Sequence, residues 1–151
     1  MVYWLFQGNP KYYRVLDAIR DFEQMPWLVT RLGHQMAPGD ELLIWVSGSA
    51  AGIYAIAEIL EPPKMIVKPP DIKYWIDKSR IGLKSQALIR FTNKLLDKPL
   101  LRENLKQDPI LKDLTVIRQP SNTNYKVTPQ QWQRVQEIVL SDRSFELSSK
   151  E

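Results

Sequence analysis

The residues best suited to binding chemistry lie between Pro26 and Ala57. Trp27 precedes a Thr30-Arg31 pair, and a strand–turn–strand pattern follows. We expect Trp27 to lie in a loop just before these strands, where its ring can stack on a flat ligand such as a nucleobase. On chemistry alone, a Trp in a small domain more often fills the core. Two interpretations of Trp27 therefore stay open, a stacking site and a core residue.

The chain offers few residues for catalysis. Ser47 and Ser49 lie in the small-residue loop SGSAAG, but a serine nucleophile needs a base held by a third group, and His34 is the only histidine. There are no cysteines, which excludes disulfides, thiolate zinc sites and Cys nucleophiles. Neither the P-loop motif nor G-x-G-x-x-G is present. We therefore expect a non-catalytic protein with no cofactor and no metal site.

Positive charge is concentrated in one segment. Residues 64–98 hold nine basic and three acidic side chains, a net charge of +6, whereas the whole chain carries +4. Such an asymmetry suits a polyanionic partner, and we expect these side chains to line one face near a binding pocket. A solvated, lysine-rich surface would have the same composition.

Length and composition indicate a single soluble domain. The chain has 151 residues, of which 44% are hydrophobic and 25% charged, as in ordinary globular proteins. The N-terminus does not resemble a signal peptide. No apolar run approaches the roughly 20 residues that span a bilayer. We predict a cytoplasmic protein with one domain over residues 1–140 and a polar, flexible tail over 141–151.

Hydrophobic periodicity predicts an α+β fold. Residues 41–47 and 53–60 are apolar on both faces, which indicates central strands of a curled sheet or a small barrel. Asn9 and Pro10 suit the start of a helix, and Thr128 with Gln131 forms a capping box. The predicted strands are 2–6, 41–47, 53–60, 83–92 and 114–118, followed by a loop over 119–126. The predicted helices are 11–24 and 129–140, with short helical pieces near 31–35, 99–107 and 109–113.

The order of these motifs resembles the EVE domain family. YWLFQGNP, PWLVTR, PGDELLIWVSGSAAGIYAIAEIL and TNYKVTPQQWQRV follow the family's order over about Val2 to Leu140. The EVE domain belongs to the PUA-like superfamily and is a relative of the YTH domain. The resemblance implies a PUA-like pseudo-β-barrel of mixed strands with flanking helices. It also implies a pocket that accepts one base flipped out of DNA or RNA, often a methylated base.

The resemblance also implies a set of site residues. The implied base-binding pocket consists of Trp27, Thr30, Ser47, Gly48 and Trp75. The implied contacts to phosphate or base are Arg31, Arg118 and Gln119. Trp27 matches the family's wall residue, and Trp75 lies where relatives place a second aromatic segment. Where close relatives often carry a Gly-Thr pair, this chain has Asn122-Thr123.

Two functions from different classes remain open. The first is a reader that captures a modified base of DNA or RNA and uses the basic segment to hold phosphates. Such a reader would need a separately encoded effector enzyme to act on the nucleic acid. The second is a small-ligand or protein-interaction module on the same fold. A salt titration separates them, because phosphate binding weakens steeply with salt and metabolite binding in an apolar pocket does not.

Overall fold

The computed structural model describes residues 1–149, with side chains up to residue 141. The strands are β1 (Tyr3–Gly8), β2 (Gln24–Leu28), β3 (Glu41–Val46), β4 (Gly52–Lys64), β5 (Gln86–Lys94), β6 (Leu100–Leu101) and β7 (Asn124–Val127). The helices are α1 (Val15–Asp21), α2 (Arg102–Leu105), α3 (Thr115–Arg118) and α4 (Pro129–Ser149). Short 3₁₀ turns are η1 (Gly33–Gln35), η2 (Ile72–Tyr74), η3 (Lys78–Arg80) and η4 (Leu111–Asp113).

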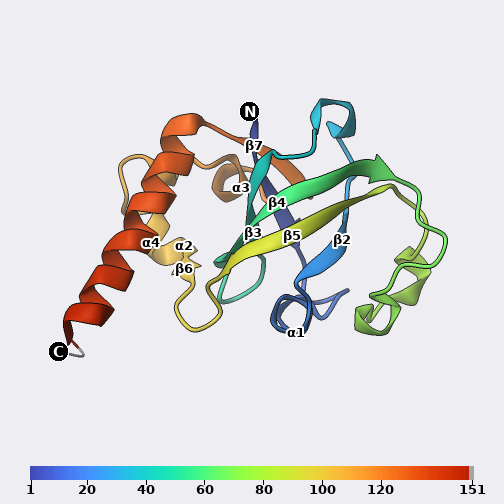
Figure 1. Cartoon of the computed structure of the whole chain (residues 1–151), viewed down its shortest axis with the longest axis horizontal. Helices are drawn as coiled ribbons and strands as arrows, with labels where there is room; N and C mark the ends of the chain where they lie inside the picture. The colour runs from blue at the N-terminus through green and yellow to red at the C-terminus, as the bar shows by residue number, and fades with distance from the viewer. Residues whose placement is uncertain (150–151) are drawn as a thin grey trace.

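The strands form one curled, mixed sheet (Figure 1). Its order is β2-β5-β4-β3-β1-β7, and β6 pairs with β4. The pair β1–β3 is parallel and the other pairs are antiparallel. With helices added to this sheet, the fold class is α+β, as the sequence predicted.

One buried side chain links the two edges of the curled sheet. No backbone ladder joins β2 to β7 in the described part of the chain, so the sheet is not closed into a barrel. Instead, Thr30 N donates to Asn124 Oδ1 over 2.8 Å, and Asn124 Nδ2 donates to the Leu28 carbonyl over 3.1 Å. Asn124 is fully buried on β7, and Leu28 ends β2. These bonds satisfy edge groups that a closed barrel would pair through the backbone.

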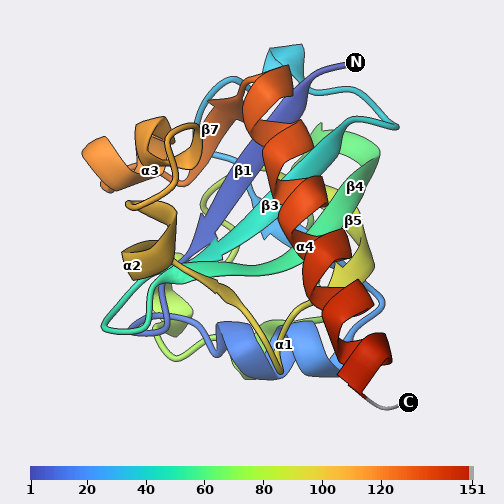
Figure 2. The same ribbon diagram turned by 90° about the vertical axis from the view of Figure 1, so that its left-hand side faces the viewer.

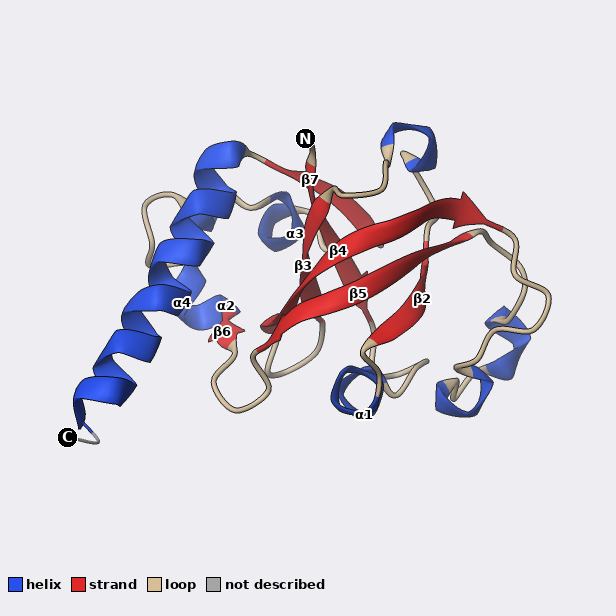
Figure 3. Ribbon diagram, viewed as in Figure 1, coloured by secondary structure: helices blue, strands red, loops and turns tan. Residues whose placement is uncertain are grey.

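Apolar side chains cover both faces of the central strands. On β1, Trp4 and Phe6 point to one core, whereas Leu5 points to the other. The first core fills the inside of the curl together with α1, and the second lies under α2, α3 and α4. Figures 2 and 3 show α4 lying across the outer face of the sheet. The prediction of two-sided, central strands is confirmed.

The first predicted helix is wrong in extent. Helix α1 covers only Val15–Asp21, and Gln24–Leu28 is strand β2, where we expected first helix and then loop. Asn9 Oδ1 accepts from Lys11 N over 2.9 Å, so Asn9 stabilises a turn and not a helix N-terminus. Pairing with β5 forms the strand, and Pro26 is tolerated because β2 lies at a sheet edge.

The prediction is also wrong between residues 114 and 127. The expected strand at 114–118 is the short helix α3, and strand β7 lies within and just beyond the expected loop at 119–126. An apolar run of this length fits either a strand or a helix, and here the buried side of α3 packs against the second core. The segment 99–107 contains β6 and α2, and η4 falls within 109–113.

The last helix begins as predicted. Gln131 N donates to Thr128 Oγ1 over 3.1 Å, and Thr128 N donates to Gln131 Oε1 over 3.0 Å, which is the capping box. The helix continues to Ser149, beyond the expected end at residue 140. Residues 150–151 of the expected tail lie outside the described part of the chain. Among residues 1–149, no helix has the length and apolarity needed to cross a membrane.

Candidate base-binding site

A cavity of about 460 Å³ opens where strands β1 and β3 end. Because these strands are parallel, their carboxyl ends meet at one edge, with Gly8 beside Val46. Ser47 N donates to the Gly8 carbonyl over 3.0 Å, which continues this pairing into the cavity wall. The rest of the lining comes from four further parts of the chain and from Arg102; these parts are residues 9, 12 and 13, residues 25–28 of β2, residues 71, 75, 80 and 86, and residues 120–123.

Trp27 forms part of the cavity wall from a strand and not from a loop. It lies on β2 opposite Ala87 of β5, and only 5% of its surface is exposed. Gly8 makes this placement possible, since a Cβ at residue 8 would lie 3.1 Å from Trp27 Cζ2 and 2.9 Å from a Val15 methyl. Trp27 is therefore both a core residue and a cavity residue, and the two interpretations of the sequence are compatible.

A second aromatic residue, Trp75, lines the same cavity. Its ring packs edge-on against Tyr13, with 4.7 Å between the ring centroids, and a backbone bridge links the two residues. The Tyr13 hydroxyl in turn donates to Asp71 Oδ2 over 2.7 Å. Tyr13 thus joins Trp75 and Asp71, both from the 71–80 segment, to the turn after β1.

Asp71 is a buried carboxylate in the cavity wall, with 1% of its surface exposed. Burial raises the pKa of its carboxyl, and the hydrogen bond from Tyr13 partly offsets this effect. Burial, followed by the nearby Asp71 charge, raises the pKa of the Tyr13 hydroxyl. Tyr13 therefore keeps its proton at neutral pH and serves as the donor in this pair.

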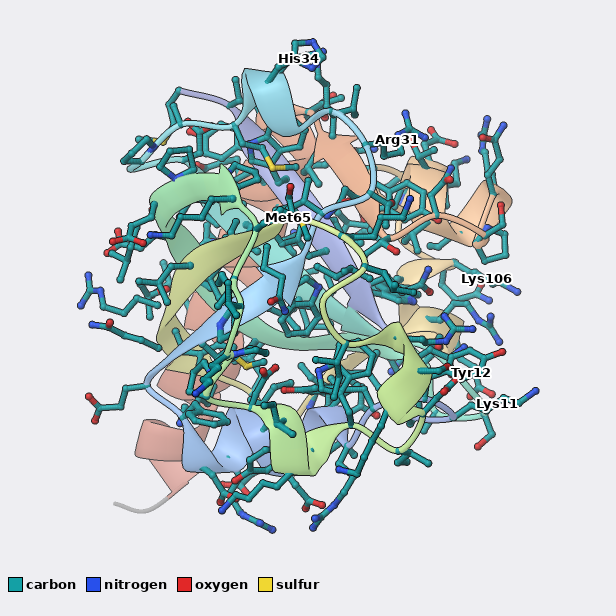
Figure 4. All side chains as sticks on the ribbon, turned by 90° about the vertical axis from the view of Figure 1, so that its right-hand side faces the viewer. Lys11, Tyr12, Arg31, His34, Met65 and Lys106 are labelled. Carbon is teal, nitrogen blue, oxygen red and sulfur yellow. The ribbon has the colours of Figure 1, made fainter. Side chains whose placement is uncertain are left out.

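Of the residues implied by the resemblance, four line this cavity: Trp27, Ser47, Gly48 and Trp75. Thr30 and Arg31 instead line a separate, more open hollow beside His34. Figure 4 shows Arg31 and His34 at one end of the molecule and Tyr12 toward the other.

The remaining two implied contacts lie just before the cavity's last loop. Arg118 is exposed and pairs with Asp113. Gln119 offers its carbonyl to the Tyr125 hydroxyl, over 2.6 Å. Neither lines the cavity, although residues 120–123, which follow directly, do.

The basic segment contributes little to the cavity itself. Arg80 is its one positive side chain in the lining, and it lies over the Tyr12 ring with 3.6 Å to the centroid. Arg102, from outside the segment, also lines the cavity. Arg90 pairs with Glu58 on the β4–β5 surface. The gathering of the segment's charges at the pocket mouth therefore stays a prediction, supported by Arg80 alone.

Sequence reasoning missed the polar side chains of the cavity, Gln7, Tyr13 and Asp71. Asp71 follows a Pro-Pro pair within four residues of Trp75, and this was the available signal. Gln7 and Tyr13 flank the turn at Asn9. Because we predicted a helix start at Asn9, the position of these two side chains in the cavity wall was not predicted. In the described residues, no group of three His, Asp or Glu side chains is arranged to hold a metal ion.

Solved structures with the same fold include proteins from distant organisms. A hypothetical protein from Leishmania major has 18% identity and a TM-score of 0.71, covering 95% of this chain and 97% of that one. Human THYN1, in complex with DNA containing 5-methylcytosine, has 13% identity and a TM-score of 0.66, covering 91% and 97%. The YTH domain of Zygosaccharomyces rouxii MRB1, in complex with N6-methyladenosine RNA, has 12% identity and a TM-score of 0.58, covering 91% and 85%.

At these identities the likeness shows a shared fold alone. No curated protein matches the sequence with significance. The model of the EVE domain family matches residues 2–138, which is nearly the whole chain and includes every strand from β1 to β7. This chain therefore belongs to the EVE domain family.

Proposed function

We propose that this protein is a non-catalytic reader that binds nucleic acid by holding one flipped, methylated base in the cavity at the ends of β1 and β3. The observation that carries the proposal is the lining of this cavity. Trp27 and Trp75 form parts of its wall, and buried polar side chains such as that of Asp71 also belong to the lining. Its volume falls in the range of about 300–1,000 Å³ that is typical of ligand pockets. Aromatic walls with a few polar groups suit a flat, hydrogen-bonding ligand.

The ligands of two structural neighbours support a base as that ligand. Human THYN1 was solved with DNA containing 5-methylcytosine, and the MRB1 YTH domain with N6-methyladenosine RNA. Both ligands carry a methylated base. We extend to this chain only the class of ligand, a modified base in a nucleic acid.

Arg80 and Arg102 supply positive charge at the cavity lining, where a flipped nucleotide would bring its phosphates. We propose that these two side chains contact the backbone, together with Arg31 and Arg118 on longer stretches of nucleic acid. An effector enzyme encoded elsewhere would act on the bound site.

A binding panel tests the proposal. Single-stranded oligonucleotides of one sequence, each with a different modified base at one position, are titrated at fixed salt and again over a salt series. We expect a preference for one modified base and a fall in affinity with rising salt. Equal, salt-independent binding, or binding of free nucleosides alone, would support the small-ligand module instead.

A further inference from the structure

The loop between β4 and β5 carries most of the exposed apolar side chains. Residues 65–85 leave the sheet where Lys64 pairs with Gln86, and Figure 1 shows them as a loop beyond the ends of the two strands. Of the eight large hydrophobic side chains that are exposed in the described residues, five lie in this β4–β5 loop, namely Met65, Val67, Ile72, Ile76 and Leu83. Single exposed apolar residues are ordinary on a protein surface, whereas such a concentration marks an interaction surface.

The β4–β5 loop is also positively charged. Lysines accompany the apolar residues at positions 64, 68, 73, 78 and 84. The two acidic residues of the loop do not offset this charge at the surface, because Asp71 is buried and Asp77 pairs with Arg80. Lys68 and Lys84 are exposed and make no ion pair with another described residue. Apolar side chains among free lysines suit a partner that is anionic outside and apolar inside, such as the phosphates and stacked bases of a nucleic acid.

The position of the β4–β5 loop favours nucleic acid over an anionic membrane, which has similar chemistry. Trp75 and Arg80, from the middle of the loop, line the cavity. Pro63 and Ser85, at its two ends, line the second, more open hollow. The loop therefore runs from one hollow to the other and back. A nucleic acid with one base in the cavity lies beside this loop.

Three of the exposed apolar residues lie between the two hollows along the chain. Met65 and Val67 are on the outgoing part of the loop, and Leu83 is on the returning part, after Arg80. Val67 is 91% exposed, more than any other large hydrophobic residue in the described part of the chain. Figure 4 shows Met65 on the side of the molecule that the loop covers. We call these three residues the apolar group of the β4–β5 loop.

The backbone of the β4–β5 loop is restrained. Pro62-Pro63 and Pro69-Pro70 bracket residues 64–68 and limit their conformations. Ile76 N donates to the Tyr12 carbonyl over 2.9 Å, which ties the middle of the loop to the turn after β1. A preorganised loop loses little conformational entropy when a partner buries its exposed side chains.

We infer that the apolar group of the β4–β5 loop inserts into the base stack of a duplex next to the extruded base. The inference rests on the proposed function, because a base captured from a duplex leaves a gap in the stack. Aliphatic side chains fill such a gap and recover part of the lost stacking. Lys68 and Lys84, the neighbours of Val67 and Leu83, then contact the phosphates on either side. A single strand has no closed stack and does not need the apolar group.

The test compares a duplex with a single strand. One probe is a single-stranded oligonucleotide with 5-methylcytosine at one position, and the other is the same strand paired with its complement. The variant combines Val67→Ser with Leu83→Ser, which removes two members of the apolar group and leaves the cavity lining intact. We expect it to bind the duplex about five-fold or more weakly than the parent does, and to bind the single strand with unchanged affinity.

Leu140→Ser is the matched control. Leu140 lies on α4, outside the cavity lining, and is 63% exposed, against 66% for Leu83. This change should leave the affinity for both probes unchanged. Because all the substituted side chains are exposed, thermal melts should show a Tm close to that of the parent for each variant.

Equal losses on both probes, or no loss on either, would overturn the inference, as would a parent protein that binds the single strand but not the duplex. Vesicles of phosphatidylserine and phosphatidylcholine test the alternative partner. If the parent binds them and the double variant does not, while duplex binding is unchanged, the loop is a membrane-binding element and the inference fails. An abasic single strand tests the proposed function separately. If it binds as tightly as the 5-methylcytosine strand, base capture itself fails.

Discussion

Trp27 serves the core and the cavity at once. Since only 5% of its surface is exposed, replacing it with Ala would remove core packing worth about 3–5 kcal/mol and confuse folding with binding. Trp27→Phe keeps most of this packing and reduces the stacking surface. We expect it to weaken binding of base-bearing oligonucleotides by about three- to ten-fold and to leave abasic oligonucleotides unaffected, as measured by fluorescence anisotropy.

Trp132→Phe is the matched control for this change. Trp132 lies on α4 and stacks on Tyr3 with 4.9 Å between ring centroids, away from the cavity lining. It should lower the Tm and leave the affinity for every oligonucleotide unchanged. An equal loss of affinity in both variants would show that the effect of Trp27→Phe arises from general destabilisation.

Asp71 predicts a pH dependence of stability. Because its pKa is raised in the folded state, ionisation costs the folded protein more than the unfolded chain. This residue's contribution is therefore fully favourable below the ordinary carboxyl pKa and is lost as the pH rises through the raised value. Asp71→Asn cannot ionise, and its carbonyl can still accept from Tyr13. In thermal melts, the Tm of Asp71→Asn should increase relative to that of the parent as the pH rises from about 4 to 7. A difference in Tm between variant and parent that stays constant with pH would contradict the raised pKa of Asp71.

At the scale of elements, Asn124 holds the two edges of the sheet together. Its side chain accepts from Thr30 N and donates to the Leu28 carbonyl, and both partners adjoin the end of β2 that carries Trp27. Asn124→Ala would leave two backbone groups unpaired, for an expected loss of about 2–4 kcal/mol in the free energy of unfolding. Urea denaturation measures this loss. Asn104→Ala, on the exposed side of α2, should cost far less, and equal losses would contradict a bridging role.

The sequence allowed some elements to be predicted and hid others for physical reasons. Thr128 and Gln131 form a local motif, so the start of α4 was predictable. Strand β2 was not, because it is short, contains Pro26 and depends on pairing with β5. Ser47, Gly48 and both cavity tryptophans followed from the order of family motifs. Asp71 could not be identified, since its free oxygen becomes evident only when the 71–80 segment packs against Tyr13.

For the whole molecule, the position of charge matters more than its total of +4. Arg102 lines the cavity, whereas Arg90 pairs with Glu58 on the β4–β5 surface. We expect Arg102→Gln to reduce the slope of log affinity against log salt by about 0.7, the value for one phosphate contact on a single strand. Arg90→Gln removes the same charge and should leave the slope unchanged. Equal effects would indicate a diffuse surface field and no defined phosphate contact.

The most direct test of base capture compares one oligonucleotide with and without a base at a single position. The probes are a single strand carrying 5-methylcytosine and the same strand carrying an abasic site, titrated against the parent protein at fixed salt. Both probes present the same phosphates, so any difference in affinity comes from the base. Since stacking contributes about 1–3 kcal/mol, we predict that the base-bearing strand binds roughly 5- to 150-fold more tightly. Equal affinities, with any of the four ordinary bases or 5-methylcytosine at that position, would contradict base capture in this cavity.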